Sequence, residues 1–144
     1  MMGLPNIPRR SNAMNEIANI LIVDDKPNLA RVTAVALRTL SCDSMTAVDT
    51  AAATKILAEK KVDAVLLDLN LNGEDGFVFL AQLVEQFPSI PIILFTAQTR
   101  EEIQAEALRR GAFDCLFKPF TLDDLKLQLS RISNYRNPAA KTGV

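Results

Sequence analysis

Short, largely apolar runs recur five times along this chain, and segments with helical spacing separate them. The runs are expected to form strands near residues 18–24, 43–48, 63–68, 91–96 and 113–118. Apolar strands of this length that alternate with helices are typical of a parallel sheet buried on both faces. The alternation therefore predicts an α/β fold, a doubly wound five-stranded parallel sheet with helices on both faces.

Helices are expected near 27–40, 50–60, 76–87, 99–110 and 121–134, from apolar spacing and end signals. Pro27 suits a first helical turn, and Gly111 suits the residue that ends the fourth helix. Thr99 and Thr121, each followed by acidic residues, predict helix starts. Three helices show an apolar stripe that should face the sheet. The stripes are Leu29, Val32, Ala36 and Leu40; Phe77, Leu80, Leu83, Val84 and Phe87; and Leu122, Leu125, Leu129 and Ile132.

The composition suits one compact domain and excludes several functions. The chain has 144 residues, of which 49% are hydrophobic and 23% charged, with a formal net charge of −1. This balance lacks the basic footprint of a nucleic-acid-binding protein, so no direct nucleic-acid partner is expected. No apolar stretch approaches the roughly 20 residues that span a bilayer, so no membrane association is expected. The chain contains no histidine, which excludes His-based zinc sites, Ser-His-Asp hydrolysis and self-phosphorylation on His.

The ends of the chain differ from its middle. Residues 1–16 have no periodicity and are expected to be a disordered N-terminal tail, in which Ser11-Asn12-Ala13 before Met14 is typical of residues left by a cloning vector. The folded domain should cover 17–134, and 135–144 should be a C-terminal tail or linker stub. No secretory signal is evident, and two cysteines make no disulfide framework, so a cytoplasmic location is expected.

Polar residues end four of the five predicted strands. The ends carry Asp24 and Asp25, then Asp68, Thr96 and Lys118. The carboxyl ends of parallel strands gather at one edge of a sheet, where ligands bind. Three carboxylates there suit Mg²⁺, and a carboxylate beside a cation can act as a nucleophile toward a phosphoryl group. Each residue taken alone is more often structural, so the hypothesis depends on the set occurring together.

With these motifs the sequence resembles the response-regulator receiver domains of the CheY-like family. The resemblance covers about residues 18–134, and its motifs are Ile20–Asp25, Leu66–Leu71, Gly73–Phe77, Phe95–Ala97, Gly111–Asp114 and Lys118–Phe120. It implies a flavodoxin-like strand order of 2-1-3-4-5. It also implies that Asp68 accepts a phosphoryl group from a phosphohistidine on a sensor histidine kinase or phosphotransfer protein.

The resemblance further implies a role for each site residue. Asp25 and Asp68 would bind Mg²⁺ directly, and Asp24 largely through water. The backbone carbonyl of Asn70 would complete the protein ligands, and the phosphoryl oxygens would be held by Thr96, Ala97 and Lys118. The domain would catalyse only its own phosphorylation and dephosphorylation. Its signal would leave through the fourth helix, fifth strand and fifth helix, toward a downstream protein, an output domain or a second copy in a homodimer.

Two positions depart from the family pattern. Cys115 stands where the family commonly has an aromatic switch residue, and Asn72 stands where Pro is usual, so a looser loop is expected. Cys115 should lie too far from Cys42 to form a disulfide. Phe117 and Leu127 are candidate apolar contacts on the signalling surface.

Two other functions compete with the phosphorylated receiver. One is a pseudo-receiver, a protein-interaction module that acts independently of phosphorylation, which Cys115 favours and the complete Asp and Lys set opposes. The other is a Mg²⁺-dependent phosphatase of the aspartyl-phosphate type. That class usually has a second Asp two positions after its nucleophile, where this chain has Asn70.

Overall fold

A five-stranded parallel sheet forms the centre of the protein. The computed structural model describes residues 17–71, 73–98 and 101–136. Within them the sheet contains β1 (Asn19–Val23), β2 (Asp43–Ala47), β3 (Ala64–Asp68), β6 (Ile92–Thr96) and β7 (Asp114–Phe117). The strand order is β2-β1-β3-β6-β7, and every neighbouring pair is parallel. Counted along the chain, β6 and β7 are the fourth and fifth strands of this sheet, so the order is the predicted 2-1-3-4-5.

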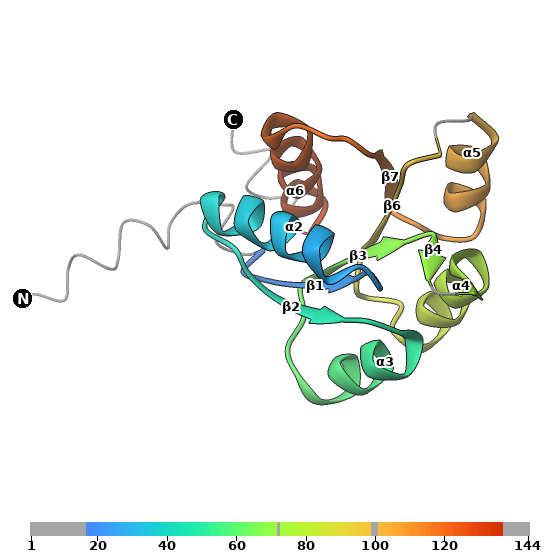
Figure 1. The fold of residues 1–144 in the computed structure, drawn as a ribbon. Coiled ribbons are helices and arrows are strands. Elements are labelled where there is room, and N and C mark those ends of the chain that lie inside the picture. Colours follow the sequence, from blue (N-terminus) through green and yellow to red (C-terminus); the bar gives the residue numbers. More distant parts are fainter. Residues whose placement is uncertain (1–16, 72, 99–100, 137–144) are drawn as a thin grey trace, which may run out of the picture.

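Helices cover both faces of the sheet, as Figure 1 shows. They are α2 (Pro27–Thr39), α3 (Thr50–Glu59), α4 (Gly76–Gln86), α5 (Glu101–Arg109) and α6 (Leu122–Arg136). Buried side chains of α2 and α6 form one core with the sheet, and those of α3, α4 and α5 form a second core on the opposite face. The doubly wound architecture predicted from the alternation is therefore confirmed.

The central strands contribute side chains to both cores. All five residues of β3 are buried, and so are all five of β6. Val65 and Leu67 lie in the core beside α3 and α4, whereas Ala64 and Leu66 lie in the core beside α2 and α6. A strand covered on both faces needs apolar residues at every position, which explains the continuous runs in the sequence.

Only half of the predicted stripe of α2 faces the core: Ala36 and Leu40 are partly buried against it, whereas Leu29 and Val32 point away from it. Val32 is 68% exposed and Leu29 is 45% exposed, while the helix buries Ala30, Thr33 and Leu37. The first half of the helix therefore turns Ala30 and Thr33 toward the core, and not the larger Leu29 and Val32.

The other two stripes are largely correct. Leu80 and Leu83 of α4 are buried, and so are Leu125, Leu129 and Ile132 of α6, whereas Leu122 is exposed. The buried Phe79 of α4 was not among the predicted residues.

Local signals set several helix ends as the sequence predicted. Thr121 and Asp124 form a reciprocal cap before α6: the Asp124 N–H donates to Thr121 Oγ1 at 3.0 Å, and the Thr121 N–H donates to Asp124 Oδ2 at 2.9 Å. Gly111 has a φ of +102° after α5, a conformation that a glycine adopts without strain. Pro27 occupies the first residue of α2. The predicted cap at Thr99 lies outside the described residues.

A small hairpin after β3 was not predicted. Strands β4 (Asn70–Leu71) and β5 (Glu74–Asp75) pair antiparallel, and Gly73 between them has a φ of +86°. Strands of two residues are too short to show a periodic pattern. The prediction for Asn72 lies outside the described residues.

Gly76 closes the base of the hairpin. Its N–H donates to the Leu69 carbonyl at 3.0 Å, and a Cβ at this position would lie 2.4 Å from that same oxygen. The close backbone approach requires a residue without a side chain.

The two ends of the described chain meet at Asp63. Its Oδ2 accepts from the N–H groups of Ala18 and Asn19 at 3.0 and 2.9 Å, and its Oδ1 lies 3.4 Å from Nη1 of Arg136. Helix α6 ends at Arg136, two residues past the predicted boundary at 134. Residues 1–16, with Ser11–Met14, and residues 137–144 lie outside the described part. Across the described residues, no helix has both the length and the apolar character needed to span a membrane.

Candidate functional site

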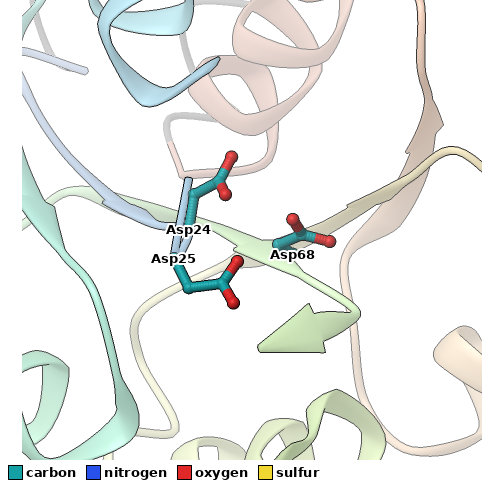
Figure 2. Close-up of side chains that lie close together, drawn as sticks. All are labelled: Asp24, Asp25 and Asp68. Atoms are coloured by element: carbon teal, nitrogen blue, oxygen red, sulfur yellow. The ribbon is translucent and has the colours of Figure 1, made fainter. Parts of the chain in front are cut away.

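Three carboxylates lie close together at one edge of the sheet. Asp24 and Asp25 directly follow β1, and Asp68 is the last residue of the neighbouring strand β3. Val23 lies opposite Leu67 in the parallel register, so the next residues, Asp24 and Asp68, lie at the same level at the edge of the sheet. One oxygen from each carboxylate lies within 4.8 Å of the others. Figure 2 shows the three side chains grouped at the adjoining strand ends.

Lys118 brings a positive charge to this cluster from the end of β7. Its Nζ lies 3.2 Å from Asp68 Oδ2 and 3.6 Å from Asp24 Oδ2, and its side chain is 20% exposed. The backbone N–H of Lys118 donates to the Thr96 carbonyl at 2.7 Å, and the bond to Pro119 is cis. The ammonium also lies 4.4 Å from the centre of the Phe95 ring. Lys26 adds a second positive charge at the exposed rim, where its Nζ lies 3.2 Å from Asp25 Oδ1, so three carboxylates and two ammonium groups meet at this site.

Asp24 is the most deeply buried of the three acids. Its Oδ1 accepts from the Lys26 N–H at 2.9 Å, whereas no described residue donates a hydrogen bond to its Oδ2, which is also buried. Burial is the main cause that raises the pKa of the Asp24 carboxyl, and the charge of Asp68 raises it further. A buried carboxylate oxygen without a donor, beside two more carboxylates, has the hard-oxygen chemistry that a divalent cation requires.

The Asp68 carboxylate is held between two donors. Its Oδ1 accepts from the Asn70 N–H at 3.1 Å, and its Oδ2 accepts from Lys118 Nζ. Asn70 begins the hairpin, so the hairpin backbone starts within hydrogen-bonding distance of the acid cluster. The role predicted for the Asn70 carbonyl stays a prediction.

Thr96 and Ala97 lie at the same edge of the sheet. Thr96 is the buried last residue of β6, and its Oγ1 accepts from the Gln98 N–H at 3.1 Å. Asp68 lies opposite Phe95 in the register of β3 and β6, so Thr96 is one residue beyond it. Ala97 is exposed. Their predicted contact with phosphoryl oxygens stays a prediction.

The two cysteines lie in different cores. Cys115 on β7 belongs to the core beside α3, α4 and α5, whereas Cys42 belongs to the core beside α2 and α6. Both are free thiols, as the prediction of no bridge between them requires. Burial raises the pKa of each thiol to about 11, so both are protonated at neutral pH.

The predicted apolar contacts differ in exposure. Leu127 on α6 is 59% exposed, whereas Phe117 is half-buried and packs against the core beside α3, α4 and α5. An open groove of about 360 Å³ runs along β7 and α6, with Cys115, Phe117 and Leu127 among its lining residues.

Sequence reasoning missed two features around the site. A pocket of about 420 Å³ adjoins it, lined by residues that include Leu29, Val32, Lys118 and Phe120. The exposed face of α2 thus reaches the site, although Leu29 and Val32 were predicted to face the sheet. The second is a pair of hydrogen bonds between Glu74 and Thr50, which were missed because no local pattern predicts that these two residues meet.

These observations define an α/β sheet domain with a buried acid cluster and a lysine at the carboxyl ends of its strands. A sequence profile described as the response regulator receiver domain matches residues 20–130, so the chain belongs to this family. It is therefore a receiver domain of two-component signalling, which confirms the family suggested by the motifs.

Similar proteins include two curated regulators. Regulatory protein AtoC of Escherichia coli (strain K12) is 36% identical over 118 residues, which cover 82% of this chain and 26% of AtoC. The putative response regulator NtrX-like of Rickettsia bellii (strain RML369-C) is 34% identical over 117 residues, which cover 80% of this chain and 24% of that protein. This chain thus spans about a quarter of the length of these relatives.

Solved structures have the same fold. The receiver domain of NtrX from Brucella abortus is 31% identical and superposes with a TM-score of 0.75, covering 80% of this chain and 98% of that one. A CheY-like receiver domain from Methanospirillum hungatei JF-1, 20% identical, gives a TM-score of 0.77 over 85% of this chain and 98% of that one. At this lower identity the similarity concerns the fold alone.

Proposed function

We propose that Asp68 accepts a phosphoryl group from a phosphohistidine on a sensor histidine kinase or phosphotransfer protein. The observation that carries the proposal is the Lys118 ammonium 3.2 Å from Asp68 Oδ2, inside a cluster of three acids. A carboxylate oxygen of Asp68 forms the new O–P bond as the N–P bond to the donor imidazole breaks, and the departing imidazole takes up a proton. Lys118 then exchanges its contact with Asp68 for one with the phosphoryl oxygens, and the Thr96 hydroxyl and Ala97 backbone hold the others.

The same proposal assigns Mg²⁺ to the acid cluster. Asp25 and Asp68 bind it directly, Asp24 through water, and the Asn70 backbone carbonyl completes the protein ligands. The buried Asp24 Oδ2 supports this assignment: no described residue donates a hydrogen bond to it, and the single ammonium of Lys118 at 3.6 Å is shared with Asp68, so a cation would add the positive charge that three carboxylates require. When bound, Mg²⁺ offsets the negative charge on the acids and on the incoming phosphoryl group.

A small-molecule phosphodonor tests the acceptor without a kinase. The protein is incubated with phosphoramidate and MgCl₂ and analysed on a Phos-tag gel. We expect one shifted band for the wild type, none with excess EDTA and none for Asp68→Asn. Asp114→Asn, which changes a buried acid outside the cluster, should still give the band. Equal modification of the wild type and Asp68→Asn would overturn the proposal.

We further propose that phosphorylation alters the surface formed by α5, β7 and α6, where it signals to a downstream protein, an output domain or a second copy of the chain. The exposed Leu127 and the groove beside it support this surface. Beryllofluoride with Mg²⁺ should shift the amide NMR resonances of β7 and α6 and leave those of α3 largely unchanged. Light scattering of the same samples tests for a homodimer.

A pseudo-receiver is the second candidate, because Cys115 occupies the switch position of β7 and a thiol cannot move between pockets as an aromatic ring does. It predicts that beryllofluoride leaves the α5–β7–α6 resonances unchanged even though Asp68 is modified.

The remaining assignments concern the whole protein. We propose a receiver domain that begins at residue 17, as predicted, and that includes α6 to its last residue, Arg136, two residues beyond the predicted boundary at 134; we propose that it acts in the cytoplasm. One relative is the DNA-binding transcriptional regulator NtrC of Escherichia coli (strain K12), 32% identical, of which this chain covers 25%. Because the charge of this chain is nearly balanced, we propose that this domain itself does not bind nucleic acid.

A further inference from the structure

The hairpin beside the acid cluster is bonded to the start of α3. Glu74 Oε2 accepts a hydrogen bond from the Thr50 hydroxyl at 3.2 Å, and Glu74 Oε1 accepts from the Thr50 N–H at 3.3 Å. Thr50 is the first residue of α3, and a helix leaves its first N–H groups without partners inside the helix. A carboxylate is favoured there because its charge opposes the helix dipole. The bond therefore joins two segments that lie 24 residues apart.

The other attachments of the hairpin lie along its base and its inner side. Leu71 is buried in the core, and Asp75 caps α4 by accepting from the Phe77 N–H at 2.9 Å. Glu74 pairs with Leu71 in the ladder, one residue from Asn70. The contact with Thr50 thus restrains the outer strand of the hairpin directly beside the segment that carries Asn70.

We propose that Glu74 is a positioning residue for the metal site, and this inference depends on the proposed function. By fixing β5 to α3, Glu74 holds the paired backbone of β4 in place, so that the Asn70 carbonyl is already in position when Mg²⁺ binds. The Asn70 N–H is also held by Asp68 Oδ1 at 3.1 Å, but this bond does not restrain the outer strand β5, and the exposed side chain of Asn70 adds no restraint. The effect passes through the two hydrogen bonds and not through the charge of Glu74.

Calorimetric titration with MgCl₂ tests the inference on the unphosphorylated protein. Glu74→Ala should weaken Mg²⁺ binding by about three- to tenfold, the range expected for the loss of about one net hydrogen bond. Glu74→Gln removes the charge and retains one of the two acceptor oxygens, so its loss of Mg²⁺ affinity should be clearly smaller than that of Glu74→Ala. Thr50→Val removes only the hydroxyl, so its loss should be smaller. The double variant should be no weaker than Glu74→Ala, because both changes remove the same contact.

Glu85→Ala is the matched control, since Glu85 is an exposed glutamate on α4. It should leave the affinity for Mg²⁺ unchanged. Amide hydrogen exchange in Mg²⁺-free buffer gives a second measurement: exchange at Leu71 should be faster in Glu74→Ala than in Glu74→Gln.

Three results would overturn the inference. Glu74→Ala could lower the melting temperature without changing Mg²⁺ affinity, which would make the contact structural only. Glu74→Gln could bind as weakly as Glu74→Ala, which would assign the effect to charge. If the wild type itself binds no Mg²⁺, the proposed function and this inference fail together, whereas normal binding by Glu74→Ala removes the inference alone.

Discussion

Replacing Asp24 by Asn should make the Mg²⁺-free protein more stable. The closest oxygens of the three acids lie within 4.8 Å of one another, so each pair repels by about 3.5 kcal/mol at an effective dielectric constant of about 20. Asp24 therefore experiences about 7 kcal/mol of repulsion from Asp25 and Asp68. Lys118 at 3.6 Å offsets about 4.6 kcal/mol of it, and the more distant charge of Lys26 offsets a little more, which leaves about 2 kcal/mol. The burial of the charge, the main cause that raises the pKa of Asp24, acts in the same direction as this remaining repulsion. Asn retains the oxygen that accepts from the Lys26 N–H.

Urea unfolding followed by circular dichroism, in buffer with a chelator, measures this difference. We expect Asp24→Asn to raise the free energy of unfolding by about 2 kcal/mol and the melting temperature by roughly 5–10 °C. Mg²⁺ should then stabilise the wild type more than the variant, by up to about 2.7 kcal/mol at one hundred times its dissociation constant. The advantage of the variant should thus shrink or reverse in MgCl₂.

The pH dependence provides an independent check. Because the pKa of Asp24 is raised in the folded state, the folded protein takes up this proton more readily than the unfolded chain does. The penalty is complete above the raised pKa, and it declines as the pH falls from there toward the unfolded value of 3.8. The difference between wild type and Asp24→Asn should decline over the same range. A variant that is less stable than the wild type at pH 7 without Mg²⁺ would refute the reasoning.

Three further predictions concern other parts of the fold. Asp114→Asn should lower the free energy of unfolding by about 2 kcal/mol at pH 7, because Asp114 accepts charge-assisted hydrogen bonds. The pKa of Asp114 is lowered in the folded protein, so this loss of stability should decrease as the pH falls below the unfolded value of 3.8 and through the lower pKa of the folded state. Urea unfolding at pH 7 and pH 3 measures the difference. Gly76→Ala should cost about 3 kcal/mol in the same assay, because its Cβ would lie 2.4 Å from the Leu69 carbonyl oxygen. Cys42 and Cys115, buried and with pKa values of about 11, should react with Ellman's reagent far more slowly in the native protein than in urea.

The sequence identified the parts of the fold that local patterns determine. Strands buried on both faces require continuous apolar runs, and the predicted strands agree with the observed ones to within one residue at each end. The grouping of Asp24, Asp68 and Lys118 followed from parallel strands alone, because such strands carry their carboxyl ends to one edge.

The features that the sequence did not reveal depend on distant partners. The rotation of α2 on the sheet is set by its packing in the whole fold: Val32 lies outward although it is apolar, whereas Ala30, Thr33 and Leu37 lie inward. The hairpin strands have two residues each, too few for a period. The bond between Glu74 and Thr50 joins residues whose proximity only the folded chain establishes.

Two buried aspartates show why burial alone does not distinguish a structural acid from a functional one. Burial would raise the pKa of Asp114, but hydrogen bonds from the Cys115 N–H and from the side chains of Gln128, Arg131 and Gln104 outweigh it, so the pKa is lowered. Asp24 accepts one hydrogen bond from the described residues, and its pKa is raised. Four donors make Asp114 a stable link between α5, β7 and α6, whereas Asp24 retains an acceptor oxygen that a cation can use. The three side-chain donors of Asp114 come from two helices separated along the chain, so only the folded structure distinguishes the two acids.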